Sequence, residues 1–163
     1  MTDDPRIREG RRRDLPALRA IQAAVLAEPW EELLTVAAEG PPLLLVATPK
    51  GAVAAGDEAG VGGGAAAPVG YALAVTDGDD DAAYLAELAV APDRQGEGYG
   101  SALLRELVGR LREGGTDELR VTVREVDERA RAFYREHGFE RRDRLPDRYE
   151  AGDGFLLVRA IDD

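Results

Sequence analysis

The chain contains no cysteine, one histidine and one lysine among its 163 residues. The absence of cysteine excludes disulfides, Cys-ligated zinc and a cysteine nucleophile. The single histidine, His137, directly precedes Gly138, which is expected to end a helix. A histidine in that place usually interacts with the helix dipole, so we exclude a His-based catalytic triad or a multi-His site. We expect no metal site.

Long apolar runs are also missing. No run approaches the roughly twenty residues of a membrane span. Residues 1–5 have neither the basic start nor the apolar core of a signal peptide. We therefore expect a cytoplasmic protein with no membrane partner. Hydrophobic residues make up 44% of the chain, and a chain of this length is expected to form a single domain, residues 1–163.

Positive charge is scarce. The chain has 21 Lys and Arg against 32 Asp and Glu, a formal net charge of −11, and Lys50 is its only lysine. This composition, with abundant Ala and Gly, predicts a halophilic protein from a haloarchaeal, high-salt cytoplasm; an acidic mesophilic protein is the alternative. At molar salt the Debye length is about 3 Å, which screens repulsion between carboxylates. The acidity also disfavours a nucleic-acid partner.

A glycine-dense hexad at residues 95–100 follows an apolar run that ends near Pro92 and precedes a helical pattern. We predict a strand, a tight loop and a helix N-terminus. Such an element directs backbone N–H groups and the positive end of the helix dipole at an anion such as a phosphate or pyrophosphate. Glycine lets the backbone approach a ligand without a Cβ. The alternative is a glycine-rich turn before an ordinary helix.

The spacing of the hexad distinguishes between phosphate-binding motifs. Gly96, Gly98 and Gly100 do not fit the dinucleotide spacing Gly-x-Gly-x-x-Gly, and no lysine follows Gly100 as in a P-loop. Gln95, Gly98 and Gly100 instead fit (Gln/Arg)-x-x-Gly-x-(Gly/Ala). This pattern resembles the acetyl-CoA pyrophosphate loop of the GNAT superfamily of N-acetyltransferases.

Residues 127–139 resemble a second motif of the same family, Asn-x-x-Ala-x-x-(Phe/Leu)-Tyr-x-x-x-Gly-Phe. Asp127 is expected to cap a helix, and Gly138 to end it in the left-handed conformation. One face of the helix is expected to carry Ala130, Phe133, Tyr134 and His137. Taken singly, this segment is an amphipathic helix with a buried Phe–Tyr pair. Two motifs in this order make the resemblance specific between residues 85 and 139.

The resemblance implies an α/β fold, the GNAT fold. Its central sheet is mixed, mostly antiparallel, of six to seven strands, flanked by helices on both faces and splayed at the acetyl-CoA wedge. Strand patterns occur at residues 6–8, 43–47, 69–75, 82–90, 119–123, 140–144 and 155–159. Helices are expected at residues 15–26, with Asp14 as the cap, at 29–34, and in both motifs. The Gly/Ala-rich stretch 51–68 is expected to be a flexible insertion.

The resemblance implies acetyl-CoA as co-substrate and assigns roles to residues. Tyr134 matches the family's general acid, which protonates the departing thiolate; the alternative is a tyrosine that only packs against the cofactor. The backbone around Val90 is expected to pair with pantetheine and to polarise the thioester carbonyl. The predicted cofactor-binding residues are Leu88, Ala89, Val90, Gln95, Gly96, Gly98, Tyr99, Gly100, Ser101 and Asp127.

Two residues of the predicted strand 82–90 are candidates for the base. Glu87 is expected to share a face with Leu85 and Ala89, opposite Tyr84. A carboxylate amid apolar residues has a raised pKa and is suited to be a base, whereas the alternative is an exposed or Arg-paired glutamate. Tyr84 is the second candidate, acting through water.

Two positions depart from the family pattern. Asp127 stands where many members have asparagine, and an ionised carboxylate cannot donate a hydrogen bond. Whether Asp127 contacts the cofactor or serves only as a cap is therefore open. Glu97 brings negative charge into the loop where Lys or Arg is frequent. We expect Arg94, Arg129 and Arg131 to offset it.

We therefore predict an acetyl-CoA-dependent N-acetyltransferase. It transfers the acetyl group directly to a primary amine, because the chain has no cysteine to carry it. The acceptor is a protein N-terminus, a lysine or a small amine, and the enzyme is a monomer or homodimer. The charged segment 141–150 either lines the acceptor cleft or is a solvated loop. The alternative class is an acetyl-CoA-binding regulatory module without turnover.

Overall fold

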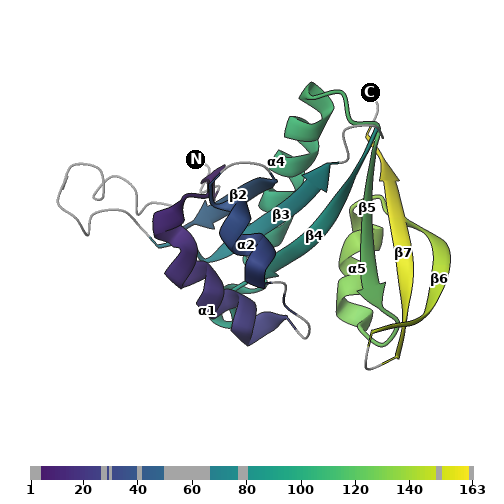
Figure 1. The fold of residues 1–163 in the computed structure, drawn as a ribbon. Helices are drawn as coiled ribbons and strands as arrows, with labels where there is room; N and C mark the ends of the chain where they lie inside the picture. The colour runs from purple at the N-terminus through teal and green to yellow at the C-terminus, as the bar shows by residue number, and fades with distance from the viewer. Residues whose placement is uncertain are drawn as a thin grey trace. The chain divides into compact units, whose positions relative to one another are not determined.

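The computed structural model describes residues 5–26, 29, 31–39, 42–49, 67–76, 81–149 and 152–161. Within them lie seven strands and four α-helices (Figure 1). The strands are β1 (Arg6–Glu9), β2 (Leu43–Thr48), β3 (Gly70–Thr76), β4 (Ala82–Val90), β5 (Glu118–Arg124), β6 (Glu140–Tyr149) and β7 (Gly152–Ala160). The helices are α1 (Leu15–Val25), α2 (Glu31–Ala37), α4 (Tyr99–Glu113) and α5 (Glu128–Glu136), with 3-10 turns η1 (Arg12–Asp14) and η2 (Pro92–Arg94).

The strands form one sheet in the order β1-β2-β3-β4-β5-β7-β6. Strand β4 is parallel to β5, whereas β1 with β2, β2 with β3, and β7 with both β5 and β6 are antiparallel. The predicted mixed, mostly antiparallel α/β sheet is confirmed. Of the Gly/Ala-rich stretch 51–68, residues 51–66 lie outside the described residues.

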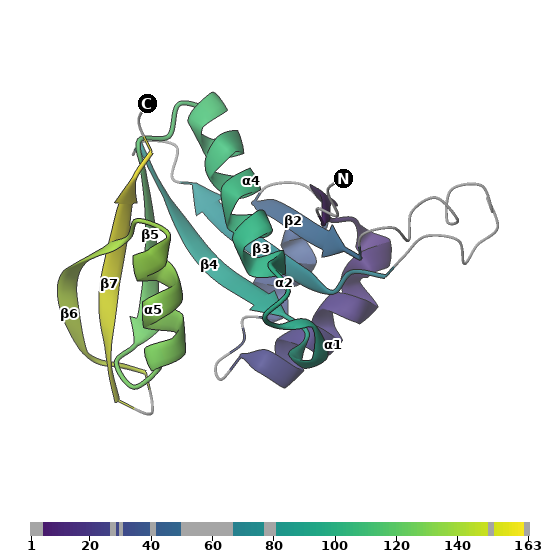
Figure 2. The same ribbon diagram turned by 180° about the vertical axis from the view of Figure 1, so that it is seen from behind.

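The chain divides into two compact units, Met1–Ala74 with Glu87–Leu107, and Val75–Ala86 with Val108–Asp163. In the first unit, α1 and α2 cover one face of β2 and β3, and the first turns of α4 cover the other (Figures 1 and 2). The side chains between these layers are fully buried, among them Leu18, Leu34, Leu45, Leu73, Leu103 and Leu104. Each helix places its apolar stripe on the sheet, which accounts for their amphipathic spacing.

In the second unit, α5 lies on one face of the β5–β7–β6 sheet (Figure 2). The side chains that alternate toward this face are buried: Val121, Val123, Phe155 and Leu157. The guanidinium groups of Arg131 on α5 and Arg141 on β6 each lie 4.8 Å from the centre of the Phe155 ring. These cation–π contacts connect the helix and the edge strand to the same residue of β7.

Asp14 stands at the N-cap position of α1 as predicted, but its side chain makes no capping hydrogen bond to that helix. Its carboxylate accepts two hydrogen bonds of 2.9 Å from the Arg8 guanidinium and one of 2.8 Å from the backbone N–H of Arg11. Burial by itself would raise the pKa of Asp14, but these hydrogen bonds and the charges of Arg8 and Arg13 lower it below its ordinary value. Asp14 therefore connects β1 to the start of α1.

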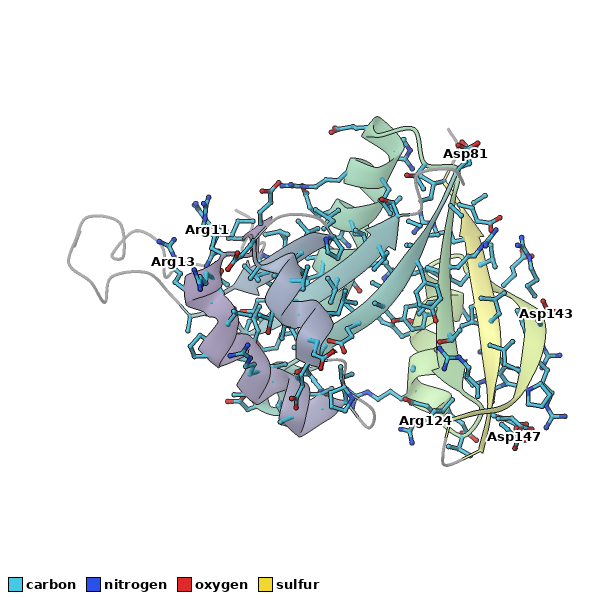
Figure 3. The ribbon with its side chains drawn as sticks, in the orientation of Figure 1. Arg11, Arg13, Asp81, Arg124, Asp143 and Asp147 are labelled. Atoms are coloured by element: carbon cyan, nitrogen blue, oxygen red, sulfur yellow. The ribbon has the colours of Figure 1, made fainter. Side chains whose placement is uncertain are left out.

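The charged segment 141–150 is part of strand β6 through Tyr149, not a solvated loop. Two of its arginines bind carboxylates elsewhere in the same unit: Arg142 binds Glu118 on β5, and Arg144 binds Asp153 on β7 and Glu125, which follows β5. Hydrogen bonds from Arg142 and Arg120 hold the pKa of Glu118 below its ordinary value. Figure 3 shows Asp143 and Asp147 along the outer side of this edge strand, where charge is common because it discourages pairing with another chain.

Gly70 occupies a position where β3 approaches the end of β4 closely. A Cβ atom added there would lie 3.0 Å from the carbonyl oxygen of Ala89, 3.2 Å from Val90 Cγ2 and 3.4 Å from Leu103 Cδ1. Only glycine leaves room for this backbone contact. No helix among the described residues is long and apolar enough to cross a membrane.

Candidate functional site

The loop between β4 and α4 has the backbone that its glycines predicted. Gly96 has φ 85° and Gly98 has φ 93°, a region that favours glycine. A Cβ atom at either position would meet nothing within 4 Å. The glycines are therefore needed for the backbone conformation rather than for lack of space.

The amide of Gln95 closes this loop. Its Nε2 donates a hydrogen bond of 3.0 Å to the carbonyl oxygen of Val90, the last residue of β4. The side chain thereby fixes where the chain leaves the strand. Because the Gln95 side chain supports the loop, the part of Gln95 that can contact a ligand is its backbone.

Helix α4 begins at Tyr99, and its first intrahelical bond runs from Ala102 N–H to Gly98 O at 3.0 Å. The N–H groups of Tyr99, Gly100 and Ser101 precede that bond, and such groups at a helix start have no intrahelical acceptor. The Tyr99 side chain is only 2% exposed. Its predicted part in cofactor binding is therefore limited to the backbone N–H.

The negative charge of Glu97 in this loop has a nearby partner. Arg94 Nη1 lies 3.6 Å from Glu97 Oε1, as predicted for Arg94. Arg131, predicted to help, instead donates to the carbonyl oxygen of Glu125 and stacks on Phe155. Both members of the Arg94–Glu97 pair are well exposed, so the pair is weak.

Strand β4 has two different faces. Leu85, Glu87 and Ala89 are buried, whereas Tyr84, Ala86, Leu88 and Val90 are half-buried. The predicted alternation is confirmed. A ligand that approaches the accessible face meets the tyrosine, and the glutamate lies on the other side of the strand.

Glu87 is buried, so the alternative of an exposed glutamate was wrong. It is 6% exposed, and its Oε1 accepts hydrogen bonds from Tyr71 Oη at 2.8 Å and from Gln22 Nε2 at 2.9 Å. Burial and the charge of Glu87 raise the pKa of Tyr71 well above its ordinary value. Tyr71 therefore stays a hydroxyl donor, and the network joins α1, β3 and β4.

Tyr84 and Thr122 form a second polar pair, on the parallel strands β4 and β5. Tyr84 Oη and Thr122 Oγ1 are 2.7 Å apart, and both residues are half-buried. The backbone register of the two strands covers Ala82 to Tyr84 opposite Glu118 to Arg120. Tyr84 is thus the last residue of β4 in this register, and Thr122 lies two residues after its partner Arg120.

Asp127 caps α5 as predicted. Its Oδ1 accepts a hydrogen bond of 3.0 Å from the backbone N–H of Ala130, and its Oδ2 lies 3.8 Å from Arg124 Nη2. Gly138 has φ 88° directly after the helix, as a left-handed C-terminal residue requires. Both ends of the second motif therefore have the predicted geometry.

Tyr134 is buried in an aromatic cluster on α5. Its ring centre lies 5.1 Å from that of Phe133 and 5.2 Å from that of Phe139, both edge-on. The His137 ring nitrogen Nδ1 lies 2.8 Å from the carbonyl oxygen of Phe133. These contacts fix the tyrosine ring on the face of α5 that the sequence predicted.

Three functional candidates were missed by reading the sequence: Gln22, Tyr71 and Thr122. Gln22 offered a signal, because it stands seven residues after Leu15 and four after Leu18 on the buried face of α1. Tyr71 and Thr122 offered none, since their partners lie elsewhere in the chain. Within the described residues, no group of three or more His, Asp or Glu side chains gathers as metal ligands.

The model of the Acetyltransferase (GNAT) family matches residues 16–139. The chain belongs to this family. No curated protein sequence matches it. The fold is shared with many solved structures. Ard1 from Thermoplasma volcanium has a TM-score of 0.79 at 23% identity, over 96% of this chain and 97% of that one.

Two further solved structures share this fold. The ribosomal-protein-S18-alanine N-acetyltransferase from Escherichia coli has a TM-score of 0.77 at 26% identity, over 98% of this chain and 96% of that one. Arabidopsis thaliana NAA60, solved in complex with acetyl-CoA, has a TM-score of 0.78 at 17% identity, over 96% of this chain and 99% of that one. The family, together with the E. coli enzyme, supports acetyl transfer as the chemistry of this GNAT chain.

Proposed function

We propose that this GNAT chain, acting as one domain over residues 1–163, is an acetyl-CoA-dependent N-acetyltransferase. The observation that carries the proposal is the β4–loop–α4 element. Two glycines with positive φ, Gly96 and Gly98, lead directly into the N-terminus of α4 at Tyr99, an arrangement of backbone and helix dipole that suits an anion. A pyrophosphate has the charge and the oxygen acceptors that such an element binds.

The remaining cofactor contacts are backbone contacts along β4. The segment from Leu88 to Val90 pairs with the amide groups of pantetheine much as one strand pairs with another. An N–H group of this segment polarises the thioester carbonyl, whose oxygen gains negative charge as the amine adds. Asp127 already serves α5 as its cap, so we assign it at most an indirect role at the cofactor.

Acetyl-CoA brings the activated acetyl group, and the chain supplies orientation and proton transfer. Since the protein has no cysteine, transfer is direct, in a ternary complex with the amine. Tyr134 is the proposed general acid, which gives its proton to the departing thiolate. The candidates for the base that takes the proton of the amine are Glu87 and, acting through water, Tyr84.

The acceptor is a primary amine: a protein N-terminus, a lysine or a small amine. A net charge of −11 favours a cationic acceptor over an anionic one. The E. coli relative is named as a ribosomal-protein-S18-alanine N-acetyltransferase, which supports a protein acceptor here. We further propose a halophilic, cytoplasmic enzyme that is a monomer or homodimer.

Calorimetric titration with acetyl-CoA, in ordinary buffer and in molar KCl, tests the proposal. Saturable binding near one equivalent, followed by amine-dependent release of free thiol, is expected. Binding without thiol release from any class of amine would favour a regulatory acetyl-CoA-binding module. Folded protein that binds in neither salt would exclude both functions.

A further inference from the structure

The hydroxyl groups of Tyr84 and Thr122 form a short contact that the fold does not require. The two atoms are 2.7 Å apart, on neighbouring strands of the unit that holds residues 75–86 and 108–163. The hydroxyl–hydroxyl distance is that of a well-formed hydrogen bond. Neither residue is fully buried, so packing alone does not explain two polar side chains held together there.

The pair lies on the accessible side of its strands. On β5, Val121 and Val123 are buried, and Thr122 between them is half-buried. On β4, Tyr84 is half-buried and Leu85 is buried. The charged neighbours on β5, Arg120 and Glu118, bind each other, and Glu118 also binds Arg142. The two hydroxyls therefore belong to half-buried, uncharged side chains beside a cluster of two arginines and one glutamate.

We propose that Thr122 positions the Tyr84 hydroxyl so that its oxygen accepts an N–H of the acceptor amine. The inference rests on the proposed acetyltransferase function and chooses Tyr84 over Glu87 as the group that meets the amine. An attacking amine must aim its lone pair at the thioester carbon, so its N–H groups need acceptors. A tyrosine whose hydrogen points to Thr122 Oγ1 presents only lone pairs to the amine.

Glu87 is less suited to this contact. Its Oε1 already accepts two hydrogen bonds, from Tyr71 and Gln22, and the side chain is on the buried face of β4. An incoming amine would have to open the core to reach either carboxylate oxygen. Glu87 therefore belongs to the internal support of β4, and Tyr84 to the accessible face.

Steady-state kinetics with the best amine found for the wild type tests the role of Thr122. Thr122→Val removes the hydroxyl at nearly constant shape and is expected to lower kcat/KM for the amine about fivefold, the effect of one ordinary hydrogen bond. The KM for acetyl-CoA should not change. Thr122→Ser should restore most of the rate. Thr48→Val, the same change at a buried threonine of β2, is the matched control and should behave as wild type.

A double-mutant cycle separates positioning from general stability. If Thr122 acts through Tyr84, Thr122→Val should have no further effect on turnover in a Tyr84→Phe background. Effects that multiply, or normal turnover of Thr122→Val alone, would overturn the inference while leaving the proposed function intact. A wild type that binds acetyl-CoA but acetylates no amine would overturn the proposed function and the inference with it.

A second readout needs no acetyl-CoA. In protein labelled with ¹³C at tyrosine Cζ, the Tyr84 resonance is identified by its loss in Tyr84→Phe. Thr122→Val should shift this resonance, and Thr48→Val should leave it in place. An unchanged Tyr84 resonance in Thr122→Val would mean that the hydrogen bond is absent in solution, which contradicts the inference.

Discussion

The carboxylate of Asp127 accepts the N–H of Ala130 and lies near the Arg124 guanidinium. Asparagine at this position could cap the helix and also donate a hydrogen bond, whereas an ionised aspartate only accepts. At the scale of single residues, Asp127 thus keeps the helix cap of the second motif but lacks the hydrogen-bond donor that asparagine would supply. Tyr134 is on the same helix, and it keeps its hydroxyl together with a fixed ring orientation.

Tyr134→Phe should lower kcat about a hundredfold, because the departing thiolate loses its proposed proton donor. The affinity for acetyl-CoA should stay nearly constant, since the ring and its contacts with Phe133 and Phe139 remain. Thiol-release assays measure kcat and calorimetry measures the affinity for acetyl-CoA, both on the same preparation. Unchanged turnover would remove Tyr134 from the mechanism.

Asp127→Ala should lower the free energy of unfolding by about 1 kcal/mol, as the loss of an N-cap does. Asp127→Asn should keep the cap and stay close to wild type. Urea unfolding compares the three proteins. If Asp127→Asn also binds acetyl-CoA more tightly than the wild type does, the lack of a hydrogen-bond donor at Asp127 accounts for the weaker affinity of the wild type.

At the scale of elements, strand β4 and the loop that follows were predictable because their pattern is local. The alternation of apolar residues, the positive-φ glycines and the helix start are all encoded within residues 82–104. The partners of Glu87 were not predictable in this way: Gln22 is 65 residues away and Tyr71 is 16 away. For segment 141–150 a solvated loop remained one of two alternatives, since the carboxylates that bind the β6 arginines lie elsewhere in the chain.

Gly98→Ala should destabilise the protein by about 1 kcal/mol, because alanine is strained at φ 93°. Acetyl-CoA affinity should fall in parallel, as the loop relaxes away from its binding conformation. Gly109→Ala is the control: it lies inside α4, a Cβ there meets nothing within 4 Å, and alanine should stabilise the helix by about 1 kcal/mol. Equal affinity in Gly98→Ala would argue that the loop does not hold phosphate.

The Arg8–Asp14 contact between β1 and α1 makes a prediction about pH. Since the pKa of Asp14 lies below its ordinary value in the folded protein, its stabilising effect is complete above the unfolded pKa of about 3.9. The effect disappears as the pH falls through the lower folded pKa. Asp14→Asn should cost about 2 kcal/mol at pH 7 and less below pH about 3. Urea unfolding at both pH values measures the difference, and a constant cost would contradict the assignment.

At the scale of the whole molecule, the main electrostatic property is the large net negative charge. A net of −11 over 163 residues creates self-repulsion that the local ion pairs on β5, β6 and β7 do not remove. The amino-acid counts alone give this property, whereas the pairing of individual arginines depends on the fold. Family membership and sheet order do not depend on this charge.

Raising the salt from about 0.1 M to about 1 M KCl shortens the Debye length from about 10 Å to about 3 Å. The melting temperature should rise, since screening relieves more repulsion between carboxylates than it weakens Arg–carboxylate pairs. Scanning calorimetry in KCl, with sucrose as the uncharged control, separates screening from general solute effects. A melting temperature that falls with KCl would show that the ion pairs outweigh the net charge.

Gly70 touches no proposed ligand, yet it supports the strand end from which the loop departs. Any side chain there would push on Ala89 and Val90. Even alanine there would require these atoms to move by a few tenths of an ångström. The start of the cofactor loop is thus constrained by a residue of a different strand, twenty-five residues earlier in the chain than Gln95.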